Sequence, residues 1–283
     1  MSSKTELLKQ QRAWASSAQR AVDARDYHAT VQDNLYQALS ASALKAFSEG
    51  SGSELVDRGG SPAKMRALHS SSALAVNFFD YWLARDAQPL FRALGFEENP
   101  SSIEFEGQFP TGLVGIPPNL DVVFRFENGK VVGVESKFTE WLTPKPLGKE
   151  VFKPKYVEAA KGLWSSKGLP RCQALVVKVQ ANEERFEYLD VAQLLKHVLG
   201  LANQHPARFE LLYLFYDCAG GESSAHHAEL ERFASLVDSG CHFRWASYQE
   251  VFRALENHAG LDHVPLLEYL RARYFPASDQ ALR

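Results

Sequence analysis

Two carboxylates and a lysine, Asp121, Glu135 and Lys137, lie close together near the middle of the chain. Carboxylates placed opposite each other repel unless a cation lies between them, and an oxygen-rich site of this kind suits Mg²⁺ or Mn²⁺. Such an ion polarises a phosphodiester and lowers the pKa of a bound water, and a lysine can orient or deprotonate that water. The alternative is structural: two carboxylates and a lysine that form salt bridges at the end of a strand.

The segment from Pro117 to Trp141 contains two β-like runs on either side of an Asn-Gly pair, which is a strong hairpin signal. Side chains two residues apart on a strand share a face. Glu135 and Lys137 are therefore expected to project together, while Ser136 points to the other side.

The length of the turn decides whether Asp121 joins them. A two-residue turn would pair Asp121 with Ser136 and place the aspartate on the wrong face. A three-residue turn over 127–129, closed by a glycine in the left-handed conformation, pairs Phe126 with Lys130 and sets Asp121 opposite Glu135. The hydrophobic pattern favours the three-residue turn because that register separates apolar from charged side chains. The apolar face then holds Val122, Phe124, Val132, Val134 and Phe138, and the other holds Asp121, Val123, Arg125, Glu135 and Lys137.

Asp121, the hydrophobic hairpin and the Glu-Ser-Lys triplet at 135–137 resemble the D…E-x-K signature of the PD-(D/E)XK nuclease superfamily, in particular its uncharacterised bacterial members. The common core of that superfamily is a helix, a three-strand meander with the signature, a helix and a further strand, and the order from about Ser71 to Tyr216 is similar. Leu120 stands where the signature has its proline, which many members lack. The resemblance implies that Asp121 and Glu135 bind the metal and that Lys137 is the catalytic cation.

The resemblance also implies further oxygen ligands for the metal. Glu106 ends the strand before the hairpin and is a candidate third carboxylate, although Glu104 shares its face and keeps the choice open. The backbone carbonyl of Ser136 is a further candidate ligand.

A glutamine in the first turn of the next helix, Gln193, matches a position that some nucleases of the superfamily place beside the metal. Lys196 and His197 follow at i+3 and i+4, so the three side chains can share one helical face and approach a phosphate. For Lys196 the alternative is a solvated helix face.

Positive charge is concentrated from Trp141 to Lys178, where the local balance is +6. Lys155, next to Tyr156, is a candidate for contact with a nucleic-acid backbone, and Glu140 is a candidate for the rim of the site. A solvated lysine-rich loop is the alternative. The eight basic residues are Lys145, Lys149, Lys153, Lys155, Lys161, Lys167, Arg171 and Lys178, against Glu150 and Glu158.

The elements that would position these side chains follow from periodicity and end signals, and they indicate an α/β fold with a mixed sheet flanked by helices, similar to restriction endonucleases. His226 and His227 are expected in a polar loop before a helix. Helices are expected at 70–83, 88–94, 191–201, 227–237 and 248–255, and strands at 103–109, 121–126, 131–138, 174–179, 209–216 and 242–246.

The first part of the chain, residues 4–48, has few helix breakers and predicts one or two amphipathic helices, followed by a Gly- and Ser-rich linker or mobile loop at 49–62. We therefore divide the chain into an N-terminal helical segment and linker that packs on the core (1–68), a nuclease-like domain (69–276) and a tail (277–283).

Composition is that of an ordinary globular protein, with 45% hydrophobic and 23% charged residues and a net charge of −3. No apolar run approaches the roughly 18 to 20 residues that cross a bilayer, and the first residues lack the apolar core of a signal peptide. Cys172, Cys218 and Cys241 form no C-x-x-C pair, which argues against a disulfide framework or a cysteine-bound zinc. A cytoplasmic protein without membrane contact is expected.

These observations predict a Mg²⁺- or Mn²⁺-dependent nuclease acting on DNA, with RNA as an open alternative substrate. The rival hypothesis is a non-catalytic protein of the same fold that binds nucleic acid or a protein. The sequence leaves the oligomeric state open, a homodimer included.

Overall fold

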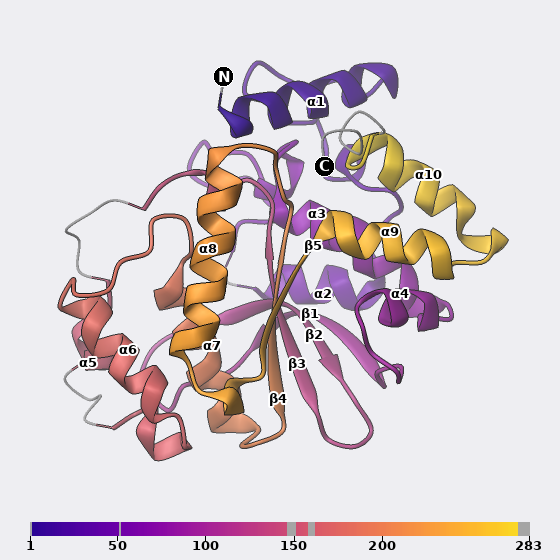
Figure 1. The fold of residues 1–283 in the computed structure, drawn as a ribbon. Coiled ribbons are helices and arrows are strands. Elements are labelled where there is room, and N and C mark those ends of the chain that lie inside the picture. The colour runs from indigo at the N-terminus through magenta and orange to yellow at the C-terminus, as the bar shows by residue number, and fades with distance from the viewer. Residues whose placement is uncertain (1, 51, 146–150, 158–161, 277–283) are drawn as a thin grey trace.

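The structure is a computed structural model, and it describes residues 2–50, 52–145, 151–157 and 162–276. In these ranges the chain forms a five-stranded mixed sheet in the order β1-β2-β3-β4-β5 (Figure 1). The first three strands are antiparallel neighbours, whereas β3, β4 and β5 are parallel. The strands are β1 (Ser102–Gln108), β2 (Asn119–Arg125), β3 (Val131–Lys137), β4 (Phe209–Phe215) and β5 (Phe243–Ser247).

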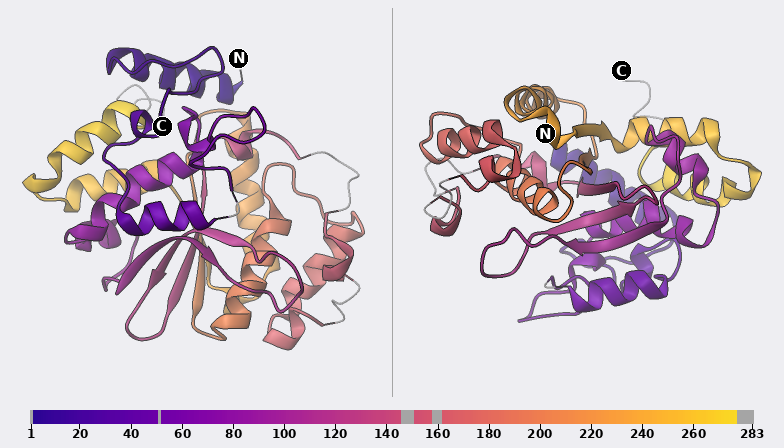
Figure 2. Two further views of the ribbon diagram at one scale, coloured as in Figure 1. Left: turned by 180° about the vertical axis from the view of Figure 1, so that it is seen from behind. Right: turned by 90° about the horizontal axis from the view of Figure 1, so that it is seen from below.

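The meander β1-β2-β3 is thus followed by two crossovers, and helices cover both faces of the sheet. The α-helices are α1 (Ser3–Ser17), α2 (Ala41–Glu49), α3 (Ser71–Phe79), α4 (Gln88–Ala93), α5 (Pro154–Val157), α6 (Pro170–Gln180), α7 (Val191–Gln204), α8 (Gly221–Leu236), α9 (Tyr248–His258) and α10 (Val264–Arg273). Viewed from below, α7 and α8 lie on one side of the sheet and α2 on the other (Figure 2). This α/β architecture with flanking helices agrees with the expected fold class.

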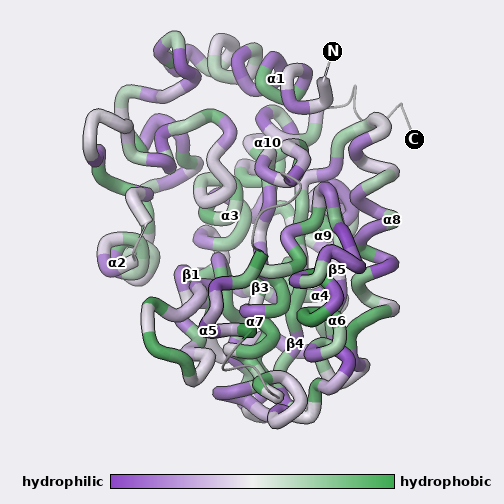
Figure 3. Tube along the Cα trace, turned by 90° about the vertical axis from the view of Figure 1, so that its left-hand side faces the viewer, coloured by the Kyte–Doolittle hydropathy of each residue, from purple (hydrophilic) through white to green (hydrophobic). Residues whose placement is uncertain are grey.

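One face of the hairpin carries an aromatic core. The ring of Phe124 lies 5.7 Å from Phe79 of α3 and 4.8 Å from Phe91 of α4, measured between ring centroids. Phe47 of α2 packs in the same way on Phe105 of β1. Hydrophobic residues dominate α7 on the opposite face, while α1 and α8 carry long hydrophilic stretches (Figure 3). The central strands are therefore covered on both faces.

The turn between β2 and β3 has the three-residue form. The amide of Phe126 donates to the carbonyl of Lys130, and Gly129 has φ of +82°, the left-handed conformation that glycine adopts without strain. Val122 pairs with Val134, and one step further this register sets Asp121 opposite Glu135. The register expected from the separation of apolar and charged residues is confirmed.

The strand expected at 174–179 is wrong, because this segment belongs to helix α6. Pro170 occupies the first turn of the helix, and the buried residues Cys172, Leu175, Val176 and Val179 recur at helical spacing, with Val177 exposed between them. A short run of β-branched residues has no period that separates a strand from a buried helix, so the burial against α7 and α8 decides the conformation.

Other helices differ in extent from the expectation. Helix α8 begins at Gly221, so His226 and His227 lie on the helix rather than in a loop, and His226 stacks on Trp141. Helix α10 was not expected at all. Its last residue, Arg273, is buried and donates to the carbonyl of Asn34, which ties α10 to the N-terminal segment.

The N-terminal segment contains two helices, as expected, with α1 lying beside α10 at one end of the molecule (Figure 1). Within the loop 52–62 the nearly buried side chain of Glu54 accepts hydrogen bonds from Lys64 and Ser72. The loop is thus held against α3. The division of the chain near residue 68 stays a prediction.

Among the described residues no helix is both long enough and apolar enough to span a bilayer.

Candidate active site

The acidic residues and the lysine of the hairpin meet at one end of the sheet, on β2 and β3. Lys137 Nζ lies 2.5 Å from Glu135 Oε1 and donates to Gln193 Oε1 at 3.0 Å. Glu135 and Lys137 share a face because they are two residues apart on β3. Gln193 reaches them because Asp190 caps α7 through the Gln193 amide and fixes the first turn above the strand.

Glu135 is almost completely buried, with 1% of its surface exposed. Its second oxygen, Oε2, lies 2.9 Å from Nε2 of His197, itself 1% exposed, but the approach is not aligned as a regular hydrogen bond. Burial opposes ionisation of Glu135, yet Lys137 and His197 outweigh it and lower the pKa of the carboxyl to about 2. Glu135 is therefore an anion at neutral pH.

Asp121 is partly buried, and its Oδ2 accepts a hydrogen bond of 2.7 Å from the amide of Ser136. Burial, followed by the charge of Glu135, raises the pKa of Asp121 well above its usual range, although Lys137 and the Ser136 amide act against this. The two carboxylates thus interact across the strand pair, and an ionised Asp121 is costly in the absence of a further cation.

Lys137 is held as a cation. Its burial would favour the neutral amine, but the charges of Glu135 and Asp121 outweigh burial and raise the pKa of Lys137. As a cation, Lys137 is suited to stabilise negative charge and poorly suited to act as a base.

Glu106 belongs to the same electrostatic neighbourhood. Burial raises the pKa of Glu106, whose Oε2 accepts a hydrogen bond of 3.0 Å from Asn119, and its charge in turn raises the pKa of Asp121. Its φ of +52° is unfavourable for a residue with a side chain, a strain that is often found at functional sites. Glu104, the alternative candidate, instead pairs with Arg125 at 2.7 Å.

A hollow of about 350 Å³ opens beside this cluster. Gln193, Lys196 and His197 line it from α7, as the i+3 and i+4 spacing predicted, and Asp190 lies at the N-terminal end of that helix. Pro118 and Asn119 line it from the start of β2. Two of the lining residues thus also contact the cluster, Gln193 through Lys137 and His197 through Glu135.

The basic segment lies partly beside this hollow. Lys155 and Lys196 lie 5.3 and 5.9 Å from the ring centroid of Tyr156, so both cations lie near one aromatic ring. Lys145 instead pairs with Asp190 at 3.0 Å, and Glu140 is exposed and accepts a hydrogen bond from the amide of Phe138. Lys149, Lys161, Glu150 and Glu158 lie outside the described residues.

The oxygen-rich chemistry of Asp121 and Glu135 fits a hard divalent cation, and Glu135 Oε2 is a buried oxygen without a regular hydrogen bond. The described residues contain no group of three or more His, Cys, Asp or Glu side chains arranged to hold a metal. Mg²⁺ is commonly bound through one or two carboxylates, with waters and substrate phosphates completing its octahedron. The Ser136 peptide, whose amide already contacts Asp121, is beside both carboxylates.

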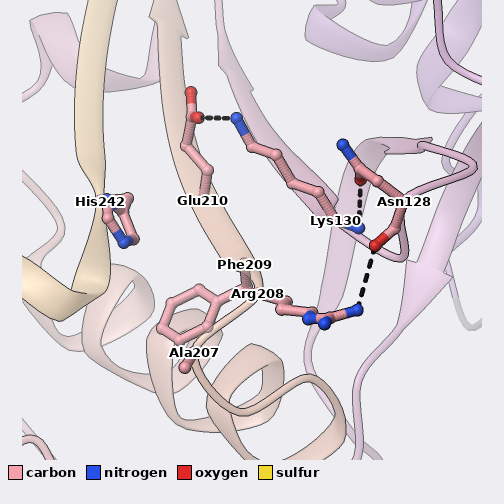
Figure 4. A pocket seen from close by; sticks show the side chains of 7 residues that line it. All are labelled: Asn128, Lys130, Ala207, Arg208, Phe209, Glu210 and His242. Carbon is pink, nitrogen blue, oxygen red and sulfur yellow. Dashed lines mark hydrogen bonds and ion pairs between the residues drawn. The ribbon is translucent and has the colours of Figure 1, made fainter.

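Figure 4 shows a second hollow, of about 360 Å³, lined by Asn128, Lys130, Arg208, Glu210 and His242, among others. It lies at the end of β3 and β4 opposite the acidic cluster, roughly 20 Å away along the strands. Its acidic residue, Glu210, forms an ion pair of 2.7 Å with Lys130 and a further one with Arg244. Arg208 donates to the carbonyl of Asn128 in the hairpin turn (Figure 4). These ion pairs leave the carboxylate neutralised, which fits a structural role.

One predicted site residue has different surroundings from those expected, and one part of the lining was not expected. His197 was expected to face a nucleic acid but is buried against Glu135, and its apolar neighbours Leu194, Leu195 and Val198 were the available signal. Pro118 and Asn119 were not predicted to line the hollow, because neither residue type indicates a chemical role.

A mixed sheet whose central hairpin brings two carboxylates and a lysine under the first turn of a crossover helix is consistent with a nuclease of the restriction-endonuclease class. The chain belongs to the family described as restriction endonuclease associating with ARP, whose model matches residues 17–275. No curated protein and no solved structure matches the chain.

Proposed function

We propose that the chain is a PD-(D/E)XK-type nuclease that hydrolyses phosphodiester bonds of DNA with Mg²⁺ or Mn²⁺. The observation that carries this proposal is the three-residue turn, because its register places Asp121 opposite Glu135, next to Lys137. The membership of a restriction-endonuclease family supports the same class of reaction.

In this proposal Asp121 and Glu135 hold the cation, which when bound supplies Lewis-acid chemistry to the phosphodiester. Glu106 and the carbonyl of Ser136 are further candidate ligands. Lys137, kept protonated by its neighbours, stabilises the negative charge that develops on the phosphate. Gln193 holds the ammonium group of Lys137 in place through its amide oxygen.

The test compares cleavage of plasmid DNA, single-stranded DNA and RNA by the wild type and by Lys137→Ala, with Mg²⁺ and with Mn²⁺. We expect Lys137→Ala to lose about 100-fold or more in rate, the usual cost of removing a group that stabilises transition-state charge. Lys130→Ala is the matched control, since Lys130 flanks the other end of β3 and pairs with Glu210. Equal cleavage by the wild type and Lys137→Ala would contradict the mechanism, and cleavage of RNA alone would correct the substrate.

One observation favours the rival, a non-catalytic binding protein of the same fold. Both oxygens of Glu135 already contact side-chain nitrogens, of Lys137 and of His197, so a cation must share them. Calorimetric titration with Mn²⁺ separates the two: binding that is lost in Asp121→Ala supports the nuclease, whereas the absence of heat with the wild type supports the rival.

A further inference from the structure

The loop between β1 and β2, residues 111–118, presents two bulky apolar side chains to solvent. Val114 is 94% exposed and Ile116 is 73% exposed. Single exposed hydrophobic residues are common on protein surfaces. Here two of them lie two positions apart at the tip of one loop, which gives that tip an apolar character.

Hydrogen bonds from neighbouring elements hold the loop in this exposed position. Lys155 Nζ donates to the carbonyl of Val114 at 2.7 Å, and Asn203 of α7 donates to the carbonyl of Pro110 at 3.0 Å. Thr111 is buried at the base of the loop and interacts with the hydroxyl of Tyr156. The polar contacts hold the backbone while the two apolar side chains stay free of the core.

The loop leads directly into the candidate active site. Pro118 and Asn119, at its end, line the hollow together with Lys196, and Asp121 follows two residues later. Lys155 contacts the carbonyl of Val114 at the apolar tip, Lys196 lines the hollow, and both cations lie near the ring of Tyr156. An occupant of this surface must offer negative charge to the lysines and apolar surface to the tip.

A nucleic acid meets both requirements, because its phosphates are anionic and its bases are flat and apolar. Proteins that bend or open a duplex insert apolar side chains such as isoleucine between base steps, while basic side chains hold the flanking phosphates. We propose that a nucleic acid places a phosphate in the hollow beside Lys196, and that Val114 and Ile116 insert against its neighbouring bases and unstack one base step there. This inference rests on the proposed function for its substrate class.

The test measures binding of a short DNA duplex to the full-length protein in the presence of Ca²⁺, in place of Mg²⁺, by fluorescence anisotropy. The variant is Val114→Ser/Ile116→Ser. We expect its affinity to fall about tenfold with no change in the slope of log K against log salt, because no cation is removed. Removing the lysine charge instead, in Lys155→Ala, should reduce the slope of log K against log salt by about one.

The matched control is Leu261→Ser, which removes an equally exposed side chain, 88% exposed, from the turn between α9 and α10. It should leave the affinity unchanged. A duplex with 2-aminopurine in place of successive adenines reports unstacking directly, because its fluorescence is quenched in a stack. Binding of the wild type should increase the 2-aminopurine fluorescence at one position of the duplex, whereas binding of the Val114→Ser/Ile116→Ser variant should increase it at none.

Equal affinity and equal brightening with the wild type and the double variant would overturn the insertion, and so would an equal loss in Leu261→Ser. Cleavage by the wild type in Mg²⁺, measured alongside, keeps the two proposals apart. If the wild type cleaves and the double variant binds normally, only the insertion fails. If the wild type neither binds nor cleaves nucleic acid, both fail.

Discussion

The pKa values of the two carboxylates of the site are shifted in opposite directions, although the two residues lie on adjacent strands. Glu135 has two nitrogen partners and a pKa lowered to about 2, whereas the pKa of Asp121 is raised. For Glu135, stability is present above its unfolded pKa and is lost as the pH falls toward 2. For Asp121 the sign is reversed, so stability is present at low pH and is lost as the pH rises through its raised folded pKa.

Asp121→Asn should therefore stabilise the protein in a chelator at neutral pH. The amide keeps an oxygen for the Ser136 amide but removes the charge that Glu135 repels. A gain of about 1 kcal/mol corresponds to a melting temperature roughly 2 to 4 °C higher. Mn²⁺ should raise the melting temperature of the wild type but not that of Asp121→Asn. A lower melting temperature for Asp121→Asn in chelator would contradict this account.

Glu135→Gln should act in the opposite direction. The substitution leaves the ammonium group of Lys137 buried beside a neutral amide, and removing one partner of a buried ion pair costs about 3 kcal/mol. Urea unfolding at pH 7 measures this cost, with Glu104→Gln as the control, because Glu104 is only partly buried and its pair with Arg125 is accessible to solvent. Equal losses in the two variants would show that Glu135 is not held as described.

At the scale of single residues, the sequence predicted the position of Asp121 opposite Glu135, because the strand register depends on a local turn and on the separation of apolar and charged side chains. The sequence did not predict the contact between His197 and Glu135. The apolar neighbours of His197 indicate its burial, but its contact with Glu135 depends on how closely α7 approaches β3, which no pattern within the helix determines.

Helix α7 carries Gln193 and His197 to the site, and its distance from the sheet is set near its middle by a glycine. A Cβ atom on Gly200 would lie 2.4 Å from the carbonyl oxygen of Phe109, closer than real contacts. Only glycine lets the helix pass the end of β1 at this distance.

Gly200→Ala should consequently destabilise the protein by about 1 to 3 kcal/mol and reduce cleavage, although alanine favours a helix over glycine by about 1 kcal/mol. Gly221→Ala is the control, since nothing lies within 4 Å of its added Cβ in α8. Thermal unfolding of both variants decides the matter: a stabilised Gly200→Ala would mean that helix propensity outweighs the contact.

At the scale of elements, most strands and helices with a clear period were predicted to within a few residues, as the helix expected at 191–201 and observed at Val191–Gln204 illustrates. The apolar run at 174–179 was not, because its β-branched residues suit a strand as well as a buried helix, and packing against α7 and α8 selects the helix. The crossover between β3 and β4 consequently contains helix α6 where a strand was expected.

The whole molecule is closed by contacts between α10 and the first part of the chain. Arg273 is completely buried, donates to the carbonyl of Asn34 at 2.6 Å and to the hydroxyl of Tyr269 at 2.7 Å, and lies over the ring of Trp14. Gln11 of α1 donates to the carbonyl of Arg273. One guanidinium group thus connects α1, the loop after it and α10.

Arg273→Ala should cost about 3 kcal/mol and expose the segment 18–40 to proteases, because buried acceptors lose a charged donor. The control lies two residues earlier: Arg271 forms an exposed pair with Glu256, so Arg271→Ala should change stability by less than about 1 kcal/mol. Limited trypsin digestion with mass analysis of the fragments measures the exposure. Protection of 18–40 in Arg273→Ala would contradict this role.

The same guanidinium contact has a consequence for how the protein is made. Asn34 and Arg273 are 239 residues apart, and Gln11 and Arg273 are 262 apart. During translation the early helices therefore leave the ribosome long before α10 exists, and they must remain without their partner while the sheet assembles. Contacts of such high sequence separation form late and slowly, so the docking of α1 is expected to be the last step of folding and the period of greatest need for a chaperone.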